Sequence, residues 1–316
     1  MKKIVYVTGC LGFIGVHVTK QCLDRGWYVI GVDKGTYASN WNFLKEFESY
    51  TNFTFLHKDI NDLEKLVDCD YIINTAAETH VDNSIMSSDV FLRSNINGVH
   101  HLLELIKQQP RYKAPVLLHF STDEVYGDIE QGSHLETDLL KPSNPYSASK
   151  AAADMLVLAW ARTYEIKYVI VRPTNNYGIG QYVEKLIPKS IKYLELGKKI
   201  DLHNHGKPVR TWLHADDTAR AVLTVIDQGV NNNIYNISGN VELPNYQVVQ
   251  KILSLYYGQD MTDCWEDFIM PSERQGQDVR YSINDLKLRN LGWSAQANFD
   301  YELAQIVEHY RKNFVW

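Results

Sequence analysis

One short run, TGCLGFIG at residues 8–15, constrains the fold of this chain more than any other. It lies between an apolar run at Lys3–Val7 and a helix-like stretch at Phe13–Arg25. Gly9 allows a tight turn, Gly12 lets the backbone approach a diphosphate, and Gly15 lets a helix pack closely on the strand. A helix N-terminus at this point offers free N–H groups and a positive dipole end to a dinucleotide. The expected contacts of this turn are Gly9, Gly12, Phe13, Ile14 and Gly15.

The first half of the chain alternates strand-like and helix-like segments. Short runs rich in valine, isoleucine and aromatic residues predict strands buried on both faces, at Lys3–Val7, Trp27–Val32, Phe53–Leu56, Tyr71–Asn74, Val116–Phe120 and Tyr168–Val171. Helices are predicted between them at Phe13–Arg25, Asp89–Gln108 and Tyr146–Tyr164. This alternation predicts an α/β fold with a Rossmann-type, doubly wound parallel sheet.

After Arg172-Pro173 turns become frequent, which indicates a second unit. We expect residues 1–172 to form the dinucleotide-binding domain, with residues 210–237 returning to it as a helix at Ala215–Ile226 and a strand at Ile234–Ile237. Residues 173–209 and 238–316 are expected to form mainly a smaller C-terminal α/β lobe that binds the substrate.

An acidic residue ends the second predicted strand. The carboxylate of Asp33 can accept hydrogen bonds from both ribose hydroxyls and would repel a 2′-phosphate, which favours NAD over NADP. Lys34 follows and could weaken that repulsion. The other expected cofactor contacts lie after the third and fourth strands, at Asp59, Ile60, Ala76 and Ala77. For the two alanines, simple packing is the alternative.

A tyrosine and a lysine four residues apart, Tyr146 and Lys150, begin a predicted helix. Residues at this spacing share a helix face, so the ammonium group can lie near the phenol and lower its pKa. Such a tyrosine is a base suited to take a proton from a sugar hydroxyl while hydride leaves the same carbon. With the glycine turn upstream and Ser121-Thr122 at the end of the fifth strand, the pattern predicts an active site, and Tyr146 and Lys150 are also expected to contact the cofactor.

Composition narrows the possible partners. The 316 residues carry a net charge of −6 and no long basic run, so neither nucleic acid nor an anionic membrane is expected as a main partner. No 18 consecutive apolar residues occur, and the short apolar run after Met1-Lys2-Lys3 does not resemble a signal peptide. The cysteines, which have no CxxC or metal-ligand spacing, favour a cytoplasmic protein without a metal site; they are Cys10, Cys22, Cys69 and Cys264.

The sequence resembles the extended short-chain dehydrogenases and, within them, the dTDP-glucose 4,6-dehydratases. The matching segments are TGCLGFIG (8–15), DKGTYASN (33–40), NTAAETHVDNSI (74–85), STDEVYG (121–127), YSASKA (146–151), RPTNNYG (172–178), KLIP (185–188), VRTWLHADD (209–217), YNI (235–237) and RQGQDVRYSIN (274–284). The Asp-Glu pair within STDEVYG is the most specific, because related sugar epimerases lack it.

This resemblance implies roles for three adjacent residues. Oxidation at C4 of a sugar acidifies the C5 hydrogen, which Glu124 would remove, while a protonated Asp123 would give its proton to the departing C6 hydroxyl. Thr122 would hydrogen-bond the C4 oxygen beside Tyr146. The implied reaction forms a 4-keto-6-deoxy sugar on a nucleoside diphosphate.

The resemblance also implies substrate contacts in the second unit, at Asn176, Lys185, Arg210, Asn236 and Arg274. The two arginines are the candidates to clamp a phosphate in a bidentate manner. The chain departs from the family in three places: HNHG at 203–206 replaces Tyr-Gly-x-Gly, RQGQD at 274–278 replaces Arg-Pro-Gly-His-Asp, and Asn83 replaces an arginine. These departures indicate a variant substrate, such as a UDP sugar that could carry an acetamido group at C2.

Alternatives remain open at this point. A UDP-GlcNAc 4,6-dehydratase, with or without C5 epimerisation, is a close alternative to a 4,6-dehydratase that acts on dTDP- or UDP-glucose. A 4-epimerase is less favoured because it has no use for the Asp-Glu pair. A non-catalytic NAD-binding regulator would not need the catalytic residues. The helix at 146–164 is apolar on nearly every side and is expected to be buried all round, by a second subunit across helices 146–164 and 89–108 or by another part of the same chain.

Overall fold

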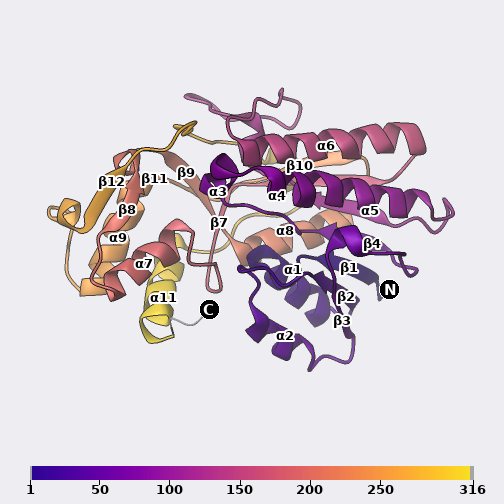
Figure 1. The fold of residues 1–316 in the computed structure, drawn as a ribbon, viewed down its shortest axis with the longest axis horizontal. Helices are drawn as coiled ribbons and strands as arrows, with labels where there is room; N and C mark the ends of the chain where they lie inside the picture. The colour runs from indigo at the N-terminus through magenta and orange to yellow at the C-terminus, as the bar shows by residue number, and fades with distance from the viewer. Residues whose placement is uncertain (1, 314–316) are drawn as a thin grey trace.

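The computed structural model describes residues 2–313, and its centre is a seven-stranded sheet (Figure 1). The strand order is β10-β6-β5-β4-β1-β2-β3, and every neighbouring pair is parallel. The strands are β1 (Ile4–Thr8), β2 (Tyr28–Asp33), β3 (Phe53–His57), β4 (Tyr71–Asn74), β5 (Val116–Phe120), β6 (Tyr168–Pro173) and β10 (Asn233–Ile237). The order reverses beside β1, as in doubly wound sheets, so the predicted Rossmann-type fold is confirmed.

Helices cover both faces of this sheet, as Figure 1 shows. One face packs on α1 (Phe13–Asp24), α2 (Trp41–Phe47) and α8 (Ala215–Gln228), which share one apolar core with it. The other face packs on α5 (Gly98–Lys107) and α6 (Pro145–Tyr164) around a second core. Strands covered on both sides explain why their sequences are continuous apolar runs rather than alternating ones.

The helix predicted at residues 89–108 forms in three consecutive pieces. A turn of α-helix, α4 (Asp89–Phe91), leads into a π-helical segment, η2 (Leu92–Asn97), and then into α5. The side chain of Asn95, in the π-helical segment, donates hydrogen bonds to Glu78 O and Ser149 Oγ at 3.0 and 2.9 Å. The wider turn therefore lies where this helix is tied to α6 and to the chain segment after β4.

A smaller lobe lies beside the C-terminal edge of the central sheet (Figure 1). It contains a three-stranded sheet, order β11-β9-β7, a two-stranded sheet, β12-β8, and three helices around their own core. These elements are β7 (Asn175–Tyr177), α7 (Leu186–Glu195), β8 (Ile200–His203), β9 (Val209–His214), β11 (Val241–Pro244), α9 (Asn245–Tyr257), β12 (Ile269–Ser272) and α11 (Phe299–Lys312).

The division between the two units differs in detail from the expectation. Residues 210–214, expected in the main domain, belong to β9 and pair with β7 and β11 of the lobe sheet. Conversely, Leu288 at α10 (Leu286–Arg289) and Trp293 pack into the core between the central sheet, α1 and α8. The chain thus crosses between the units more often than the sequence pattern indicated. Helix α8 packs into the core of the central sheet, and strand β10 lies at its edge beside β6.

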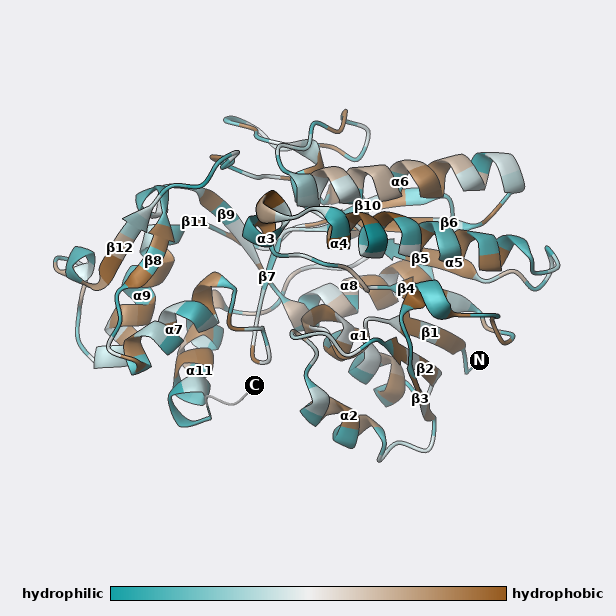
Figure 2. Cartoon of the chain, in the orientation of Figure 1, coloured by the Kyte–Doolittle hydropathy of each residue, from teal (hydrophilic) through white to brown (hydrophobic). Residues whose placement is uncertain are grey.

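Helix α6 is apolar along most of its length in Figure 2, but it is not buried all round. One side faces the sheet, while Ala148, Met155 and Ala159 are exposed on the opposite side, Met155 at 48%. Within the described part of the chain nothing covers this side, so neither the small lobe nor another helix of the same chain buries it. No helix between residues 2 and 313 is long and apolar enough to span a membrane.

Candidate active site

The glycine turn forms a tight cradle between β1 and α1. Gly9 has a φ of +71°, and its amide donates to the Val32 carbonyl at 2.7 Å. A Cβ at Gly9 would lie 2.7 Å from the Ala76 nitrogen, and a Cβ at Gly15 would lie 1.9 Å from the Gly9 oxygen. Helix α1 begins after Gly12 without a side-chain cap, so its first amides are available to an anion. This geometry fits the diphosphate of a dinucleotide.

Asp33 is largely buried at the end of β2, and its carboxylate organises the neighbouring loop. It accepts hydrogen bonds from Leu11 N at 3.0 Å, Gly35 N at 2.8 Å and Ser39 Oγ at 2.9 Å. Lys34 Nζ turns away to Ser94 Oγ, at 3.0 Å, and lies near Asp59 and Glu78. The negative charge beside the predicted ribose site is therefore paired with donors of the loop rather than with Lys34.

A single cavity brings the predicted cofactor residues together with most of the predicted catalytic ones. Its lining includes Gly9, Gly12, Phe13, Ile14, Gly15, Asp33, Lys34, Asp59, Ile60, Ala76, Ala77, Thr122, Asp123, Glu124, Tyr146, Asn176 and Lys185. Other lining residues were not predicted, among them Thr36, Ser39, Glu78, Thr79 and Glu184. Glu184 directly precedes Lys185, and Thr36 and Ser39 lie in the segment after Asp33, which is the signal that could have found them.

The Asp-Glu pair lies on a single 3₁₀ turn, η3 (Asp123–Tyr126), directly after β5. Thr122 caps this turn: its hydroxyl accepts from Glu124 N at 3.3 Å and donates to Asp123 Oδ1 at 3.1 Å. The cap fixes the backbone of the two acidic residues relative to Thr122. Thr122, Asp123 and Glu124 thus all line one cavity, because the chain turns as soon as β5 ends.

The two carboxyl groups have raised pKa values for the same main reason. Burial raises the pKa of Asp123 to about 7, and the neighbouring charge of Glu124 adds to the effect. Burial also raises the pKa of Glu124, whereas the positive charge of Arg210 opposes that increase. A carboxyl group that is partly protonated near neutral pH is able to serve as a general acid.

Glu124 is held by groups from two other segments. Its Oε2 accepts from Asn144 Nδ2 and from the hydroxyl of Tyr281, both at 3.4 Å. The single hydroxyl proton of Tyr281 is shared between Glu124 and Asp278, whose carboxylate accepts from Ser143 as well. Asp278 and Tyr281, which the sequence reasoning placed only in a matching segment, are therefore the neighbours that orient Glu124.

Tyr146 and Lys150 share one face of α6, as predicted, but the predicted lowering of the tyrosine pKa is wrong for this structure. Burial and then the charge of Glu124 raise the pKa of Tyr146, and a hydrogen bond with Thr122 opposes them only in part. Lys150 Nζ donates to the Phe120 carbonyl at 2.5 Å, and burial lowers its pKa to about 8. The lysine therefore meets the end of β5, and burial, followed by the charge of Glu124, dominates the pKa of the Tyr146 phenol.

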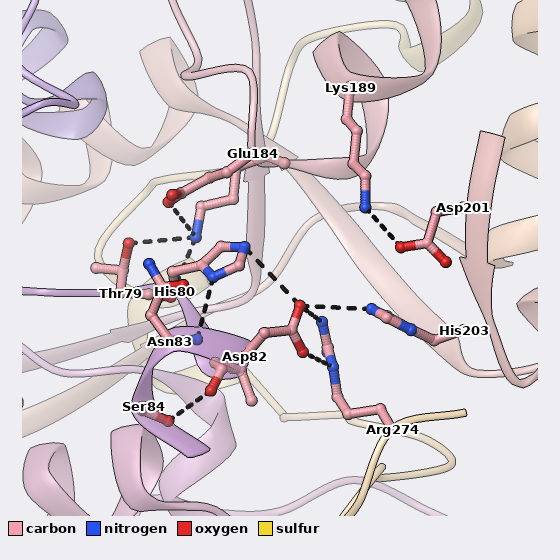
Figure 3. A network of polar contacts seen from close by, with 12 residues as sticks. Thr79, His80, Asp82, Asn83, Ser84, Glu184, Lys189, Asp201, His203 and Arg274 are labelled. Carbon is pink, nitrogen blue, oxygen red and sulfur yellow. Dashed lines mark hydrogen bonds and ion pairs between the residues drawn. The ribbon is translucent and has the colours of Figure 1, made fainter. Parts of the chain in front are cut away.

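A second cavity adjoins the first and lies between α3 (Val81–Met86) and the lobe. Arg274 crosses it and pairs with Asp82 through Nε at 2.5 Å and Nη2 at 2.9 Å (Figure 3). His203 Nε2 lies 3.4 Å from the same carboxylate, and His80 Nε2 lies 3.9 Å from it. The ion pair with Arg274 and the contact with His203 hold the pKa of Asp82 well below its usual range despite its burial.

The remaining predicted substrate residues are distributed around these two cavities. Lys185 Nζ donates to Thr79 O and Oγ1 at 3.1 and 3.2 Å, and it lies 3.3 Å from Glu184. Arg210 lines the second cavity, with its guanidinium 4.3 Å from the Tyr281 ring centre and one nitrogen donating to the Asp278 carbonyl. Lys185, Arg210 and Arg274 thus line one cavity beside Glu124, together with a fourth cationic side chain, Lys189.

Asn236 needs a correction. It is fully buried in β10, outside both cavities, and its side chain is bonded within the protein. It accepts from the hydroxyl of Tyr126 at 2.9 Å and donates to the carbonyls of His134 and Asn284 at 3.2 and 3.1 Å. A side chain whose acceptor and donors are all used in the interior has no means to contact a nucleotide, so its role is structural.

A dinucleotide cradle next to a Thr–Tyr–Lys constellation defines a protein of the short-chain dehydrogenase class. Over residues 5–238 the chain matches the model of the NAD dependent epimerase/dehydratase family. The chain belongs to this family, and the expected cofactor, NAD, agrees with it.

Similar proteins carry one activity in their names. A probable dTDP-glucose 4,6-dehydratase of Sinorhizobium fredii is 39% identical, over 99% of this chain and 94% of that protein. DesIV, a dTDP-glucose 4,6-dehydratase from Streptomyces venezuelae solved with NAD and TYD bound, superposes with a TM-score of 0.91 at 37% identity, covering 98% of this chain and 97% of that one. A trifunctional Arabidopsis thaliana protein that includes UDP-glucose 4,6-dehydratase is 37% identical over 99% of this chain and 48% of its own length.

Proposed function

We propose that this protein is an NAD-dependent nucleotide-diphosphosugar 4,6-dehydratase of the dTDP- or UDP-glucose type. One observation carries the proposal: Asp123 and Glu124 line the same cavity as Thr122, Tyr146 and the glycine cradle. An enzyme that only oxidises or epimerises at C4 needs the tyrosine and the cradle, but it has no step for a second pair of acid–base groups. The similarity to named 4,6-dehydratases over nearly the whole chain supports the same conclusion.

The first step takes place at C4 of the sugar. Tyr146 accepts the proton of the C4 hydroxyl, while Thr122 donates a hydrogen bond to the same oxygen. Because burial and the neighbouring carboxyl groups disfavour the phenolate, the ammonium of Lys150 and the positive charge of the oxidised cofactor must offset them. NAD, when bound, supplies the chemistry of this step and of the last one by accepting hydride from C4 and returning it to C6.

Loss of water follows from the C4 ketone. The ketone acidifies the C5 hydrogen, and Glu124 removes that proton. The C5–H electron pair forms the C5–C6 double bond, the C6–O bond breaks, and Asp123 gives its proton to the departing hydroxyl so that water leaves. Asp123 suits this role because its pKa of about 7 keeps a useful fraction protonated. Glu124 then returns a proton to C5 when C6 receives hydride, which completes the 4-keto-6-deoxy sugar.

The substrate lobe supplies the binding groups for the nucleoside diphosphate. Arg210, Arg274 and Lys185 provide positive charge in the second cavity, and Asn176 lines both cavities. Arg274 is paired with Asp82, so a diphosphate would compete with that carboxylate for the guanidinium. The presence of His203 in this cavity keeps a UDP sugar, including one with an acetamido group at C2, as the alternative to a dTDP sugar.

The test is direct turnover. The purified protein is incubated separately with dTDP-glucose, UDP-glucose and UDP-GlcNAc, and the products are identified by mass spectrometry and NMR. Loss of water with a new C6 methyl group is expected from at least one of them. A C4 epimer that retains its C6 hydroxyl would identify an epimerase instead, and the absence of any product would favour a non-catalytic NAD-binding protein.

A homodimer and a cytoplasmic location complete the proposal. The exposed apolar side of α6 lies beside the helix formed by residues 89–107, where Val90 and Leu92 are also exposed. Apolar side chains gathered on two adjacent helices favour a two-fold contact with a second copy. The unpaired cysteines favour a reducing compartment.

A further inference from the structure

A line of buried polar side chains crosses five neighbouring strands near the catalytic residues. Thr8 is paired with Asn74, and Asn74 with His119, in the register of β1, β4 and β5. Arg172 lies two residues beyond the β6 partner of His119 and is itself paired with Asn236 of β10. By the alternation of a strand, all five point to the face covered by α5 and α6.

Hydrogen bonds join the members of this line. Thr8 Oγ1 donates to Asn74 Oδ1 at 2.6 Å, and Asn74 Nδ2 faces His119 Nδ1 at 3.2 Å. At the other end Arg172 donates to the Tyr126 hydroxyl at 2.6 Å, which donates in turn to Asn236. The corrected role of Asn236 is thus to end this line.

Asp154, on α6, joins the two halves. Its Oδ2 accepts from Arg172 Nε and Nη2 at 3.1 and 2.9 Å and from Ser121 Oγ at 3.0 Å. Its Oδ1 lies 3.7 Å from His119 Nε2, and neither atom has a hydrogen-bond partner among the described residues. Asp154 follows Lys150 by one helical turn, and Ser121 directly precedes Thr122. One carboxylate therefore connects the helix of Tyr146 with the strand end that carries Thr122.

Stability alone is a poor reason for this arrangement. The Asp154 side chain is fully buried and that of Arg172 nearly so, and replacing a buried ion pair by well-packed apolar residues is often neutral or stabilising. The carboxylate also lies one turn from a buried ammonium group whose nearest acceptor, the Phe120 carbonyl, carries no net charge.

We propose that Asp154, held by Arg172, is a positioning residue for the catalytic Tyr146, Lys150 and Thr122. It fixes α6 against the end of β5 and supplies the negative charge that balances the Lys150 ammonium. This inference rests on the proposed function. The charged or titratable neighbours of Lys150 in this region are Tyr146 and Asp154 on α6, His119 on β5 and Arg172 on β6. Burial, and after it the charges of Lys150 and Arg172, lower the pKa of His119 well below its usual range, so His119 is neutral. Burial raises the pKa of Asp154, but the charge and hydrogen bonds of Arg172 oppose that increase, and this ion pair makes Asp154 the anion among them.

The kinetic test uses Asp154→Asn in the full-length enzyme with NAD bound. We expect kcat for water loss to fall at least 20-fold while KM changes less than threefold, because the substrate cavities do not include Asp154. Asp217→Asn is the matched control, since Asp217 is also buried and paired with an arginine, Arg220, but lies outside both cavities. It should lower the melting temperature and leave kcat within twofold. Equal kcat in Asp154→Asn and wild type would overturn the proposal.

A second variant covers the case in which Asp154→Asn does not fold. Ser121→Ala removes the hydrogen bond between Asp154 and the end of β5, at a residue that also lines the first cavity, so NAD affinity and KM are measured beside kcat. We expect kcat to fall three- to tenfold with unchanged KM and NAD affinity. An unchanged kcat in this variant would contradict the link between Asp154 and Thr122.

A titration separates this inference from the proposed function. The Lys150 signal is followed by ¹³C NMR and assigned with Lys150→Arg. It should titrate about one pH unit lower in Asp154→Asn than in wild type, because the counter-charge is lost. Ser121→Ala, which only displaces the counter-charge, should give a smaller shift in the same direction. An unshifted Lys150 titration in Asp154→Asn would refute the role of Asp154 even if the enzyme turned over every substrate. A shifted titration in a protein without dehydratase activity would uphold the charge balance and refute only the proposed reaction.

Discussion

Asp123 and Glu124 are adjacent in sequence, but their carboxyl groups meet different surroundings. Within residues 2–313, Oδ2 of Asp123 has no hydrogen-bond partner, whereas Oε2 of Glu124 accepts from Asn144 and Tyr281. Donors stabilise a carboxylate and burial favours the protonated acid; Thr122 is the one side-chain donor to Asp123 within the described residues, at Oδ1, and burial outweighs it. The two neighbours are therefore suited to opposite roles in proton transfer.

Replacing the acid should slow water loss specifically. Asp123→Asn keeps the size of the side chain but has no carboxyl proton to give to the C6 hydroxyl, so we expect kcat to fall about 10²–10⁴-fold. The measurement is the rate of 4-keto-6-deoxy product formation. Asp263→Asn, at an exposed position outside both cavities, should match wild type. A loss of less than fivefold in Asp123→Asn would remove Asp123 from the mechanism.

The raised pKa of Asp123 also predicts how stability depends on pH. Its folded-state pKa, about 7, exceeds the ordinary 3.8, so its contribution is complete below pH 3.8 and is lost as pH rises through 7. Asp123→Asn should therefore be more stable than wild type at pH 8, by roughly 2–4 kcal/mol, and this advantage should shrink toward pH 4. Denaturant unfolding at both pH values measures it. An advantage that is equal at pH 8 and pH 4 would contradict the assignment.

Glu124→Gln should separate oxidation from elimination. The amide cannot take the C5 proton, so in deuterated water we expect no deuterium at C5 and a loss of product of at least 100-fold, while substrate affinity changes little. Tyr281→Phe leaves the carboxylate but removes one of its donors and should cost only three- to tenfold. Deuterium incorporation at C5 by Glu124→Gln at the wild-type rate would show that another base acts there.

Arg274 is expected to act through binding. Arg274→Gln removes a guanidinium that is held toward the second cavity by Asp82, so KM for the nucleotide sugar should rise about 10–100-fold with a change in kcat of less than threefold. Arg111→Gln, at an exposed ion pair, is the control. Steady-state kinetics at fixed ionic strength would decide, and an unchanged KM would exclude a phosphate contact.

The proposed dimer predicts the effect of a charge on α6. Met155→Asp places a carboxylate on the exposed apolar side of the helix, so light scattering after gel filtration should give twice the chain mass for wild type and the monomer mass for the variant. Met270→Asp, at an exposed site on β12, should remain dimeric. A monomeric wild type would contradict the proposal.

Much of the fold was predictable because strands buried on both faces leave an unmistakable apolar pattern. The parallel sheet, the glycine turn and helix α6 all follow from local sequence. The lobe was harder, since β9 pairs with strands from distant segments and Trp293 returns to the main core. Such pairings depend on tertiary contacts that no local pattern encodes.

The site divides in the same way. The cavity unites the predicted cofactor and catalytic residues other than Lys150, because most of them follow the ends of parallel strands, which meet at one edge of the sheet. The neighbours that set their charge states, Tyr281, Asp278 and Asp154, come from other segments and were not assigned roles. Asn236 was wrongly expected near the nucleotide, because its position in β10 places the side chain in the buried line of polar residues and not in the cavity.

The most direct test of the central claim follows one hydrogen atom. The enzyme is given the nucleotide sugar that it turns over, labelled with deuterium at C4, and the product is examined by NMR. If oxidation at C4, loss of water and hydride return to C6 follow one another as proposed, the deuterium moves within the molecule from C4 to C6 and appears in a CH₂D group of a 4-keto sugar. A product that keeps its C6 hydroxyl and carries the deuterium at C4 would contradict dehydration.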